Sequence, residues 1–180
     1  MTIDTTGTRP LHELEDGMLE RFRDRAAVYD RDNRFFTEDL DELVDVGYLR
    51  APLPGAFGGG GATIAQMVRD QRRLGAAAPA TALATTMHLY IAGAAASLHA
   101  AGDRTLDWLL DAIAGGEIIA SGHAETGNDV PILLSTTTAE RVPGGYRVTG
   151  RKRFGSLGPA WTGLLVHAMD AHGGHPEIIH

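Results

Sequence analysis

The sequence contains no cysteine, and this absence removes three kinds of chemistry at once. Disulfide bonds, thiolate metal sites and a cysteine nucleophile are all excluded. An excess of positive charge is also missing, since 23 acidic residues against 16 Lys and Arg give a net charge of −7. A chain of this charge has no general affinity for nucleic acid or for acidic membrane surfaces. We therefore expect neither nucleic acid nor a membrane as a partner.

A hydrophobic run of membrane-spanning quality is lacking too. Residues 1–10 are polar and do not contain the apolar core of a secretion signal. The most apolar stretch, residues 76–101, is mostly Ala and Thr and is interrupted by Pro79, His88 and His99. Its hydrophobicity is weak for a lipid-facing span. It is better explained as a central helix packed through small residues, and we expect a cytoplasmic protein.

Two groups of side chains are candidates for ligand sites. The eight histidines show no spacing of paired metal ligands, since His88 and His99 are far apart and His172 and His175 lie in a Gly-rich turn, so we expect no metal site. The second group is basic and consists of Arg147, Arg151, Lys152 and Arg153. It fits either a pocket for phosphates or a solvated strand face, and we favour the strand face.

The apolar pattern changes near residue 117. Before it, apolar residues recur at helical spacing and predict helices around 11–22, 37–47, 63–74, 79–101 and 106–113. Thr63 with Gln66 predicts a capping box for the third helix, and Asp103 predicts the cap of the fifth. After it, short apolar runs between Gly and Pro predict strands at 118–120, 133–142, 146–149 and 164–169.

The predicted fold class is α+β. Residues 1–116 form an N-terminal α-helical bundle, and residues 117–180 form the start of a β-sandwich or barrel domain. A few short strands alone would leave open edges and an uncovered face. We therefore expect the β segment to be part of a larger domain.

Six short segments occur in the order seen in one enzyme family. They are a helix ending in Gly47-Tyr48-Leu49, a Pro54 to Gly59 connector, His88, Gly102, Trp108-Leu109 and Gly116-Glu117. Together they resemble the acyl-CoA dehydrogenase family. The family's Thr-Glu-Pro and Gly-Ser-Asp motif is matched by Ala124-Glu125-Thr126 and Gly127-Asn128-Asp129, which is two residues shorter and lacks both hydroxyls. Its Gly-x-Lys-x-Trp-Ile-Thr motif is matched by Gly-Arg-Lys-Arg-Phe-Gly-Ser at 150–156.

The resemblance implies a flavin held between these last two motifs. The residues expected to contact it are Ser121, His123, Ala124, Asn128, Phe154, Gly155 and Ser156. Backbone groups of the first three would bond the pyrimidine edge, and Asn128 would donate to the pyrophosphate. Phe154 would pack on the isoalloxazine and Ser156 would bond its N5 edge. The spacing of these two predicts that both side chains lie on the same side of a strand.

The activity implied is α,β-dehydrogenation of an acyl-CoA thioester by hydride transfer to FAD, in fatty acid metabolism. The Glu base of that reaction belongs to a C-terminal helical domain with no counterpart in these residues, and Glu125 is expected to be structural. No catalytic residue is therefore predicted. The resemblance also implies a homo-oligomer and an electron-transfer flavoprotein as partners.

Two alternatives stay open. The first is a flavin-dependent monooxygenase of the same fold that uses O₂ and reduced flavin, with FMN as cofactor and His88 assisting. The Phe154-Gly155-Ser156 sequence favours that branch. The second is a catalytically silent subunit that binds a partner of related fold.

Overall fold

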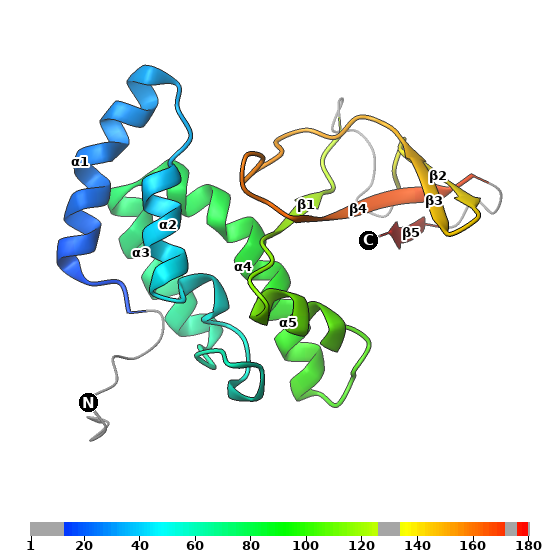
Figure 1. Cartoon of the computed structure of the whole chain (residues 1–180), viewed down its shortest axis with the longest axis horizontal. Helices are drawn as coiled ribbons and strands as arrows, with labels where there is room; N and C mark the ends of the chain where they lie inside the picture. Colours follow the sequence, from blue (N-terminus) through cyan, green and yellow to red (C-terminus); the bar gives the residue numbers. More distant parts are fainter. Residues whose placement is uncertain (1–12, 126–133, 172–175, 180) are drawn as a thin grey trace. The chain divides into compact units, whose positions relative to one another are not determined.

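The computed structural model describes residues 13–125 and 134–171, and the backbone of 176–179. The chain divides into two compact units, residues 1–117 and 118–180. Within the described residues, the first unit holds the α-helices and the second holds the strands (Figure 1). The fold is therefore α+β, and the change from helices to strands falls where the apolar pattern predicted it.

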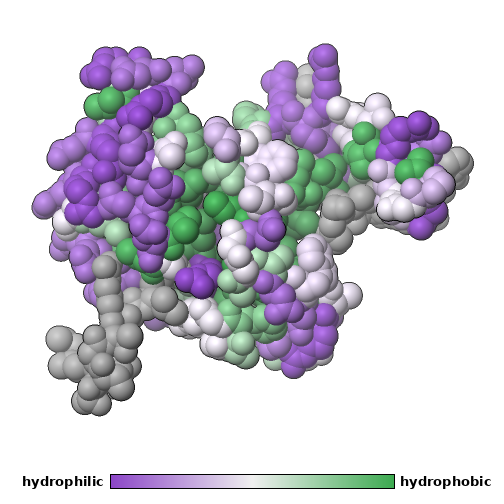
Figure 2. Space-filling view, viewed as in Figure 1, coloured by the Kyte–Doolittle hydropathy of each residue, from purple (hydrophilic) through white to green (hydrophobic). Residues whose placement is uncertain are grey.

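The helices of the N-terminal unit are α1 (Asp16–Asp32), α2 (Thr37–Asp45), α3 (Ile64–Ala77), α4 (Pro79–Ala100) and α5 (Asp107–Ala114), with 3-10 turns η1 (Tyr48–Arg50) and η2 (Gly55–Phe57). Apolar side chains from α1 to α4 form one core, which includes Phe22, Leu43, Tyr48, Leu74 and Leu89. Charged residues cover the outward side of α1 (Figure 2). This arrangement is the one that amphipathic helices adopt when they bury their apolar faces against one another.

Helix α4 is apolar around its whole circumference rather than on one face. Its buried side includes Thr85 and Ala92, which have no exposed surface, while Leu83 is 68% exposed. Pro79 occupies the first turn, where its missing N–H would have no helical partner anyway. Across the part of the chain that the structure describes, no helix combines the length and the apolar character needed to cross a membrane.

A buried polar cluster ties α1, α2 and α4 together. The completely buried Asp39 carboxylate accepts hydrogen bonds from Arg25 Nε (2.7 Å), Tyr29 Oη (3.2 Å) and Thr81 Oγ1 (3.0 Å). Burial raises the pKa of Asp39, and the bonds from Arg25 and Thr81 oppose that rise. Because these groups donate to it, the buried carboxylate has hydrogen-bond partners in place of water.

Two predicted caps have different outcomes. The capping box of α3 is confirmed, since Thr63 N–H donates to Gln66 Oε1 (2.8 Å) and Gln66 N–H donates to Thr63 Oγ1 (3.3 Å). The cap assigned to Asp103 is wrong. Helix α5 begins at Asp107, and the Asp103 carboxylate accepts the Thr105 N–H (2.9 Å) in the turn before it. The Asp103 side chain therefore closes a local turn before the helix and does not cap α5.

The strands of the second unit are β1 (Ile119–Gly122), β2 (Thr138–Val142), β3 (Gly145–Thr149), β4 (Gly163–Asp170) and β5 (Pro176–Ile179). The order β1-β4-β2-β3 forms one sheet in which β5 also pairs with β4. Strands β1 and β4 are parallel, with Ile119 opposite Gly163 and Gly122 opposite Val166. Strands β2 and β3 form the predicted hairpin around Pro143-Gly144, where Gly144 adopts φ 86°.

One strand is shorter than predicted. The expected strand at 133–142 begins only at Thr138, and residue 133 lies outside the described residues. The hydroxyls of residues 135–137 and the amides of Thr136 and Thr137 donate to the Glu125 carboxylate, and Ser135 Oγ also donates to His167 O on β4. The start of β2 is therefore set by a side chain from elsewhere in the sequence.

Candidate functional site

The two motif segments of the β unit lie side by side. Arg153 N–H donates to Ala124 O (2.9 Å), which joins the segment after β1 to the segment after β3. Lys152, on the segment after β3, also lies beside β1. Its Cγ is 3.6 Å from the position that a Cβ on Gly122 would occupy. These contacts join the segment that carries Ser121, His123 and Ala124 to the start of the segment that carries Phe154, Gly155 and Ser156.

Phe154 and Ser156 do not lie on a strand, so the predicted geometry there is wrong. Residues 151–155 are irregular and 156–160 form turns, with Gly158 N–H donating to Gly155 O (2.8 Å). Phe154 has a left-handed backbone (φ 69°), and Leu157 does too (φ 64°). The alternation rule for strands therefore does not apply, and Ser156 Oγ–H instead donates to Phe154 O (3.1 Å).

The Phe154 ring is left outside the β unit's core. It is 78% exposed, whereas Leu157 in the same turn is 2% exposed. Leu157 therefore anchors this turn and Phe154 presents an aromatic face away from it. Burying a Phe side chain stabilises a protein by about 1.5–3 kcal/mol. Because Phe154 is mostly exposed, the folded unit does not gain most of this stabilisation.

Glu125 is the best-connected side chain of the site. Its side chain is only 7% exposed and pairs with Lys152 Nζ (2.5 Å). It also accepts bonds from the hydroxyls of Ser135, Thr136 and Thr137 and from the backbone N–H of Thr136 (2.7 Å) and Thr137 (3.3 Å). Burial acts to raise the pKa of Glu125, but the bonds from Lys152, Ser135 and Thr136 outweigh it and hold that pKa far below its ordinary value. A carboxylate in this state does not accept protons near neutral pH.

A second polar group consists of side chains from β1, from the residue that follows it and from β4. Ser121 Oγ and His123 Nδ1 share a hydrogen bond. His123 directly follows β1, and its ring lies near that of His167 on β4, with ring centroids 5.9 Å apart and an angle of 44° between the ring planes. His167 is 5% exposed and His123 is half-buried. Burial, then the charges of His167 and Lys152, lower the pKa of His123.

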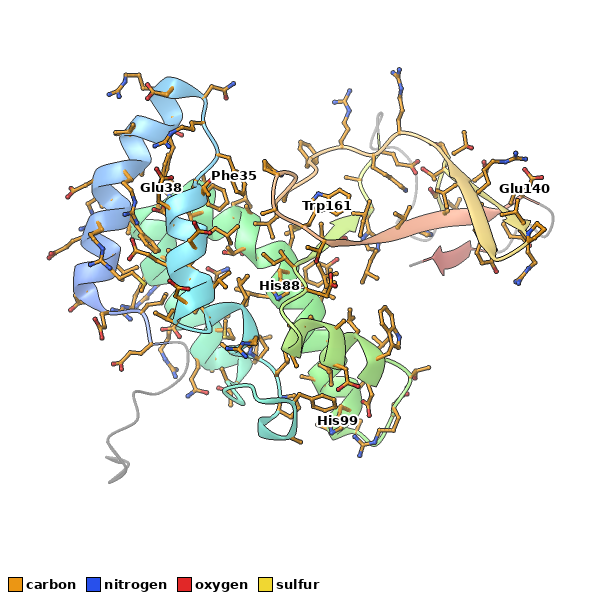
Figure 3. The ribbon with its side chains drawn as sticks, in the orientation of Figure 1. Phe35, Glu38, His88, His99, Glu140 and Trp161 are labelled. Carbon is orange, nitrogen blue, oxygen red and sulfur yellow. The ribbon has the colours of Figure 1, made fainter. Side chains whose placement is uncertain are left out.

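His88 belongs to the N-terminal unit, where Figure 3 labels it on α4. It has no exposed surface, and its Nε2 lies 3.1 Å from Leu49 O in η1. Since a carbonyl accepts, Nε2 carries a proton in this bond. The contact fixes η1 against α4, which is a structural use of the ring.

The remaining candidates are less informative. Asn128 lies outside the described residues. In the basic cluster, Arg147 pairs with Glu140 (2.5 Å) and Lys152 with Glu125, while Arg151 lines a shallow surface pocket with Thr136, Thr149 and Gly150. Among the described residues, no three His, Asp or Glu side chains are grouped so as to hold a metal ion.

Sequence reasoning missed the partners of Glu125 and the pairing of His123 with His167. The run Ser135-Thr136-Thr137 is a visible cluster of hydroxyls, but only the fold shows which carboxylate it serves. The two histidines are distant in sequence and meet because β1 and β4 are parallel.

Comparisons with known proteins show which family this chain resembles. The family model "Acyl-CoA dehydrogenase, N-terminal domain" matches residues 12–117. A Bacillus subtilis protein named as an acyl-CoA dehydrogenase, YdbM, is 30% identical over 153 residues, covering 84% of this chain and 40% of YdbM. Isobutylamine N-hydroxylase of Streptomyces viridifaciens is 38% identical over 112 residues, covering 58% of this chain and 29% of that enzyme.

A solved structure gives a similar result. KijD3 in complex with FMN and dTDP-3-amino-2,3,6-trideoxy-4-keto-3-methyl-D-glucose is 29% identical with a TM-score of 0.76, covering 90% of this chain and 40% of KijD3. The chain thus spans well under half the length of the proteins it matches.

Proposed function

The chain belongs to the acyl-CoA dehydrogenase family, and from that premise we propose that it holds a flavin and takes part in the oxygenation of a primary amine. The single observation that carries the flavin assignment is the exposed Phe154 ring beside the Ala124–Arg153 backbone bond. A flat ring system lying on Phe154 would remove that apolar face from water. Residues at positive φ, as Phe154 is, cluster at ligand sites because a strained backbone there serves binding.

The flavin would be held by both segments. Backbone groups of Ser121, His123 and Ala124 would meet its polar edge, with Asn128 as a further donor. Phe154 would supply the aromatic face, and Gly155 would allow close approach of the backbone. Ser156 already donates its hydroxyl proton to Phe154 O, so its oxygen can accept a hydrogen bond from a ligand N–H.

The choice of reaction follows from the relatives and from Glu125. One relative at 38% identity is named for N-hydroxylation of isobutylamine, and the KijD3 structure holds FMN with an amino sugar nucleotide. Both names include an amine. Glu125 is committed to Lys152 and to the hydroxyls of 135–137, so it is not the base that dehydrogenation requires. Oxygenation of an amine does not require Glu125 as a base.

When bound and reduced, the flavin supplies the two electrons that oxygenation requires. In balance, a primary amine, O₂, two electrons and two protons give a hydroxylamine and water. FMN is our preferred cofactor because KijD3 was solved with it, and FAD is the alternative. A separate flavin reductase would be the partner that delivers the reduced flavin.

Dehydrogenation of an acyl-CoA thioester with FAD is the second candidate. It is favoured by the similarity to YdbM, which covers 84% of this chain. In that case electron-transfer flavoprotein would be the redox partner and the base would come from residues other than these. Self-association into a homo-oligomer is compatible with either reaction.

The test has two stages. In the first, FMN and FAD are titrated into the protein and binding is followed by flavin fluorescence. Phe154→Ala should weaken binding about tenfold, since an aromatic contact and its buried area contribute about 1.4 kcal/mol or more. Val148→Ala, which shortens another exposed apolar side chain of the same unit (41% exposed), should leave binding unchanged. Equal binding by Phe154→Ala and the unaltered protein would refute the assignment.

In the second stage, the complete gene product is supplied with reduced flavin and O₂. Primary amines, isobutylamine among them, are assayed for hydroxylamine by mass spectrometry. In parallel, acyl-CoA thioesters are mixed anaerobically with the oxidised protein and the flavin absorbance is followed. Hydroxylamine without bleaching supports oxygenation, whereas bleaching by a thioester supports dehydrogenation.

A further inference from the structure

The imidazole of His123 has a setting that a backbone contact does not require. Its Nδ1 shares a hydrogen bond with the Ser121 hydroxyl on β1, and the centroids of its ring and of the His167 ring on β4 are 5.9 Å apart. Both strands are fixed by the parallel register of β1 and β4. Ser121 and His167 therefore lie on paired strands of one sheet, and the His123 side chain contacts both of them.

The charges around His123 favour its neutral form. His167 faces it from β4, and Lys152 faces it from the segment after β3. Glu125, two residues further along, has its charge balanced by the Lys152 ammonium and by several donors. The lowered pKa of His123 favours the neutral imidazole, which can accept a proton.

The chemistry of the proposed function needs such a group. A primary amine has a pKa near that of lysine, about 10.4, so it arrives as an ammonium ion with no lone pair on nitrogen. One N–H bond must break before the nitrogen can attack oxygen. A positioned base with a pKa near neutrality is the usual acceptor for such a proton.

Resting on the proposed function, we propose that His123 accepts the proton that the substrate ammonium loses, and that Ser121 and His167 are positioning residues for its ring. An N–H bond of the substrate breaks, its electron pair stays on nitrogen, and the proton bonds to His123 Nε2. For this, Nδ1–H must donate to Ser121 Oγ, because that bond leaves the lone pair on Nε2. The step involves no redox change, and the proton then passes to water.

The first test needs no activity. Long-range ¹H–¹⁵N NMR of the imidazoles in the 180-residue chain should show His123 protonated on Nδ1 and bare on Nε2 at pH 7, titrating below 6.5. His167→Asn should move that midpoint upward, while His99→Asn, which alters the histidine paired with Asp107 in the N-terminal unit, should not. Protonation on Nε2, or a midpoint indifferent to His167, would overturn the proposal.

The second test separates this proposal from the function it rests on. In the complete gene product, His123→Asn should lower hydroxylamine formation from isobutylamine or another accepted primary amine about 100-fold or more at pH 7. Flavin binding should be kept, and the lost rate should return in part at higher pH, where more free amine is present. Added imidazole should rescue His123→Ala. Unchanged rates in His123→Asn would overturn the role of His123 alone, whereas no flavin binding or no hydroxylamine from any amine with the unaltered protein would overturn the proposed function.

Discussion

Replacement of Glu125 by Gln should destabilise the β unit far more than its small change in shape implies. The carboxylate accepts the Lys152 ammonium (2.5 Å), three hydroxyls and two backbone N–H groups while only 7% exposed. An amide puts an NH₂ group among these donors and leaves Lys152 without its counter-charge. Removing one partner of a buried ion pair costs about 3–5 kcal/mol. Since domains are stable by about 5–15 kcal/mol, such a loss is a large share of the total.

The chain offers a clean assay for this prediction. It has two tryptophans, Trp108 in the N-terminal unit and Trp161 in the β unit. In a Trp108→Phe background, fluorescence during urea unfolding reports on the β unit alone, and the midpoint and slope give the free energy of unfolding. The matched control is Glu140→Gln, because Glu140 pairs with Arg147 on an exposed surface of the same unit (Figure 3 labels Glu140) and should contribute about 0–1 kcal/mol.

A double variant completes the experiment. If the loss comes from an unpaired Lys152, then Glu125→Gln with Lys152→Met should cost less than the sum of the two single changes. Equal losses for Glu125→Gln and Glu140→Gln, or strict additivity in the double variant, would refute the reasoning that this ion pair organises the site.

Three further predictions concern the same units. The folded-state pKa of Glu125 lies below its unfolded value of about 4.5, so its contribution to stability is present above that pH and is lost as the pH falls below it. Acid titration of Trp161 fluorescence should show this fall in the free energy of unfolding, and Glu125→Gln should reduce its dependence on pH. Phe154→Ala should change the unfolding free energy by less than about 1 kcal/mol, because the ring is 78% exposed and leaves no cavity, and a larger loss would place it in the core. Asp39→Ala should cost the N-terminal unit about 3–5 kcal/mol, read from Trp108 in a Trp161→Phe background, whereas a loss under 1 kcal/mol would show that Arg25 and Thr81 find other partners.

Local signals in the sequence predicted the elements well. The Thr63 and Gln66 capping box, the Pro143-Gly144 hairpin and the long Ala-rich helix all depend on neighbours within a few residues. These interactions form in the same way wherever the segment is placed, so a pattern is enough to find them.

The details of the candidate site depended on contacts that no local pattern contains. Glu125 meets Lys152 across 27 residues of chain, and its bonds with residues 135–137 decide where β2 begins. The alternation expected for Phe154 and Ser156 failed because residues 151–155 do not form a strand and Phe154 has a positive φ. At the start of β2 and at Phe154–Ser156, tertiary contacts determined the structure instead of the local sequence pattern.

The parallel pairing of β1 with β4 has a consequence for the order in which the chain gains structure. Its partners, such as Ile119 and Gly163, are separated by most of the β unit's sequence, whereas helices close their bonds between near neighbours. Long-range pairing must meet the entropy of loop closure before it gains any stabilisation, so it is slow. A ribosome also releases the helical unit first. The helices should therefore form on the nascent chain before β4 has been synthesised. Until then β1 is an unpaired strand that can pair with another chain.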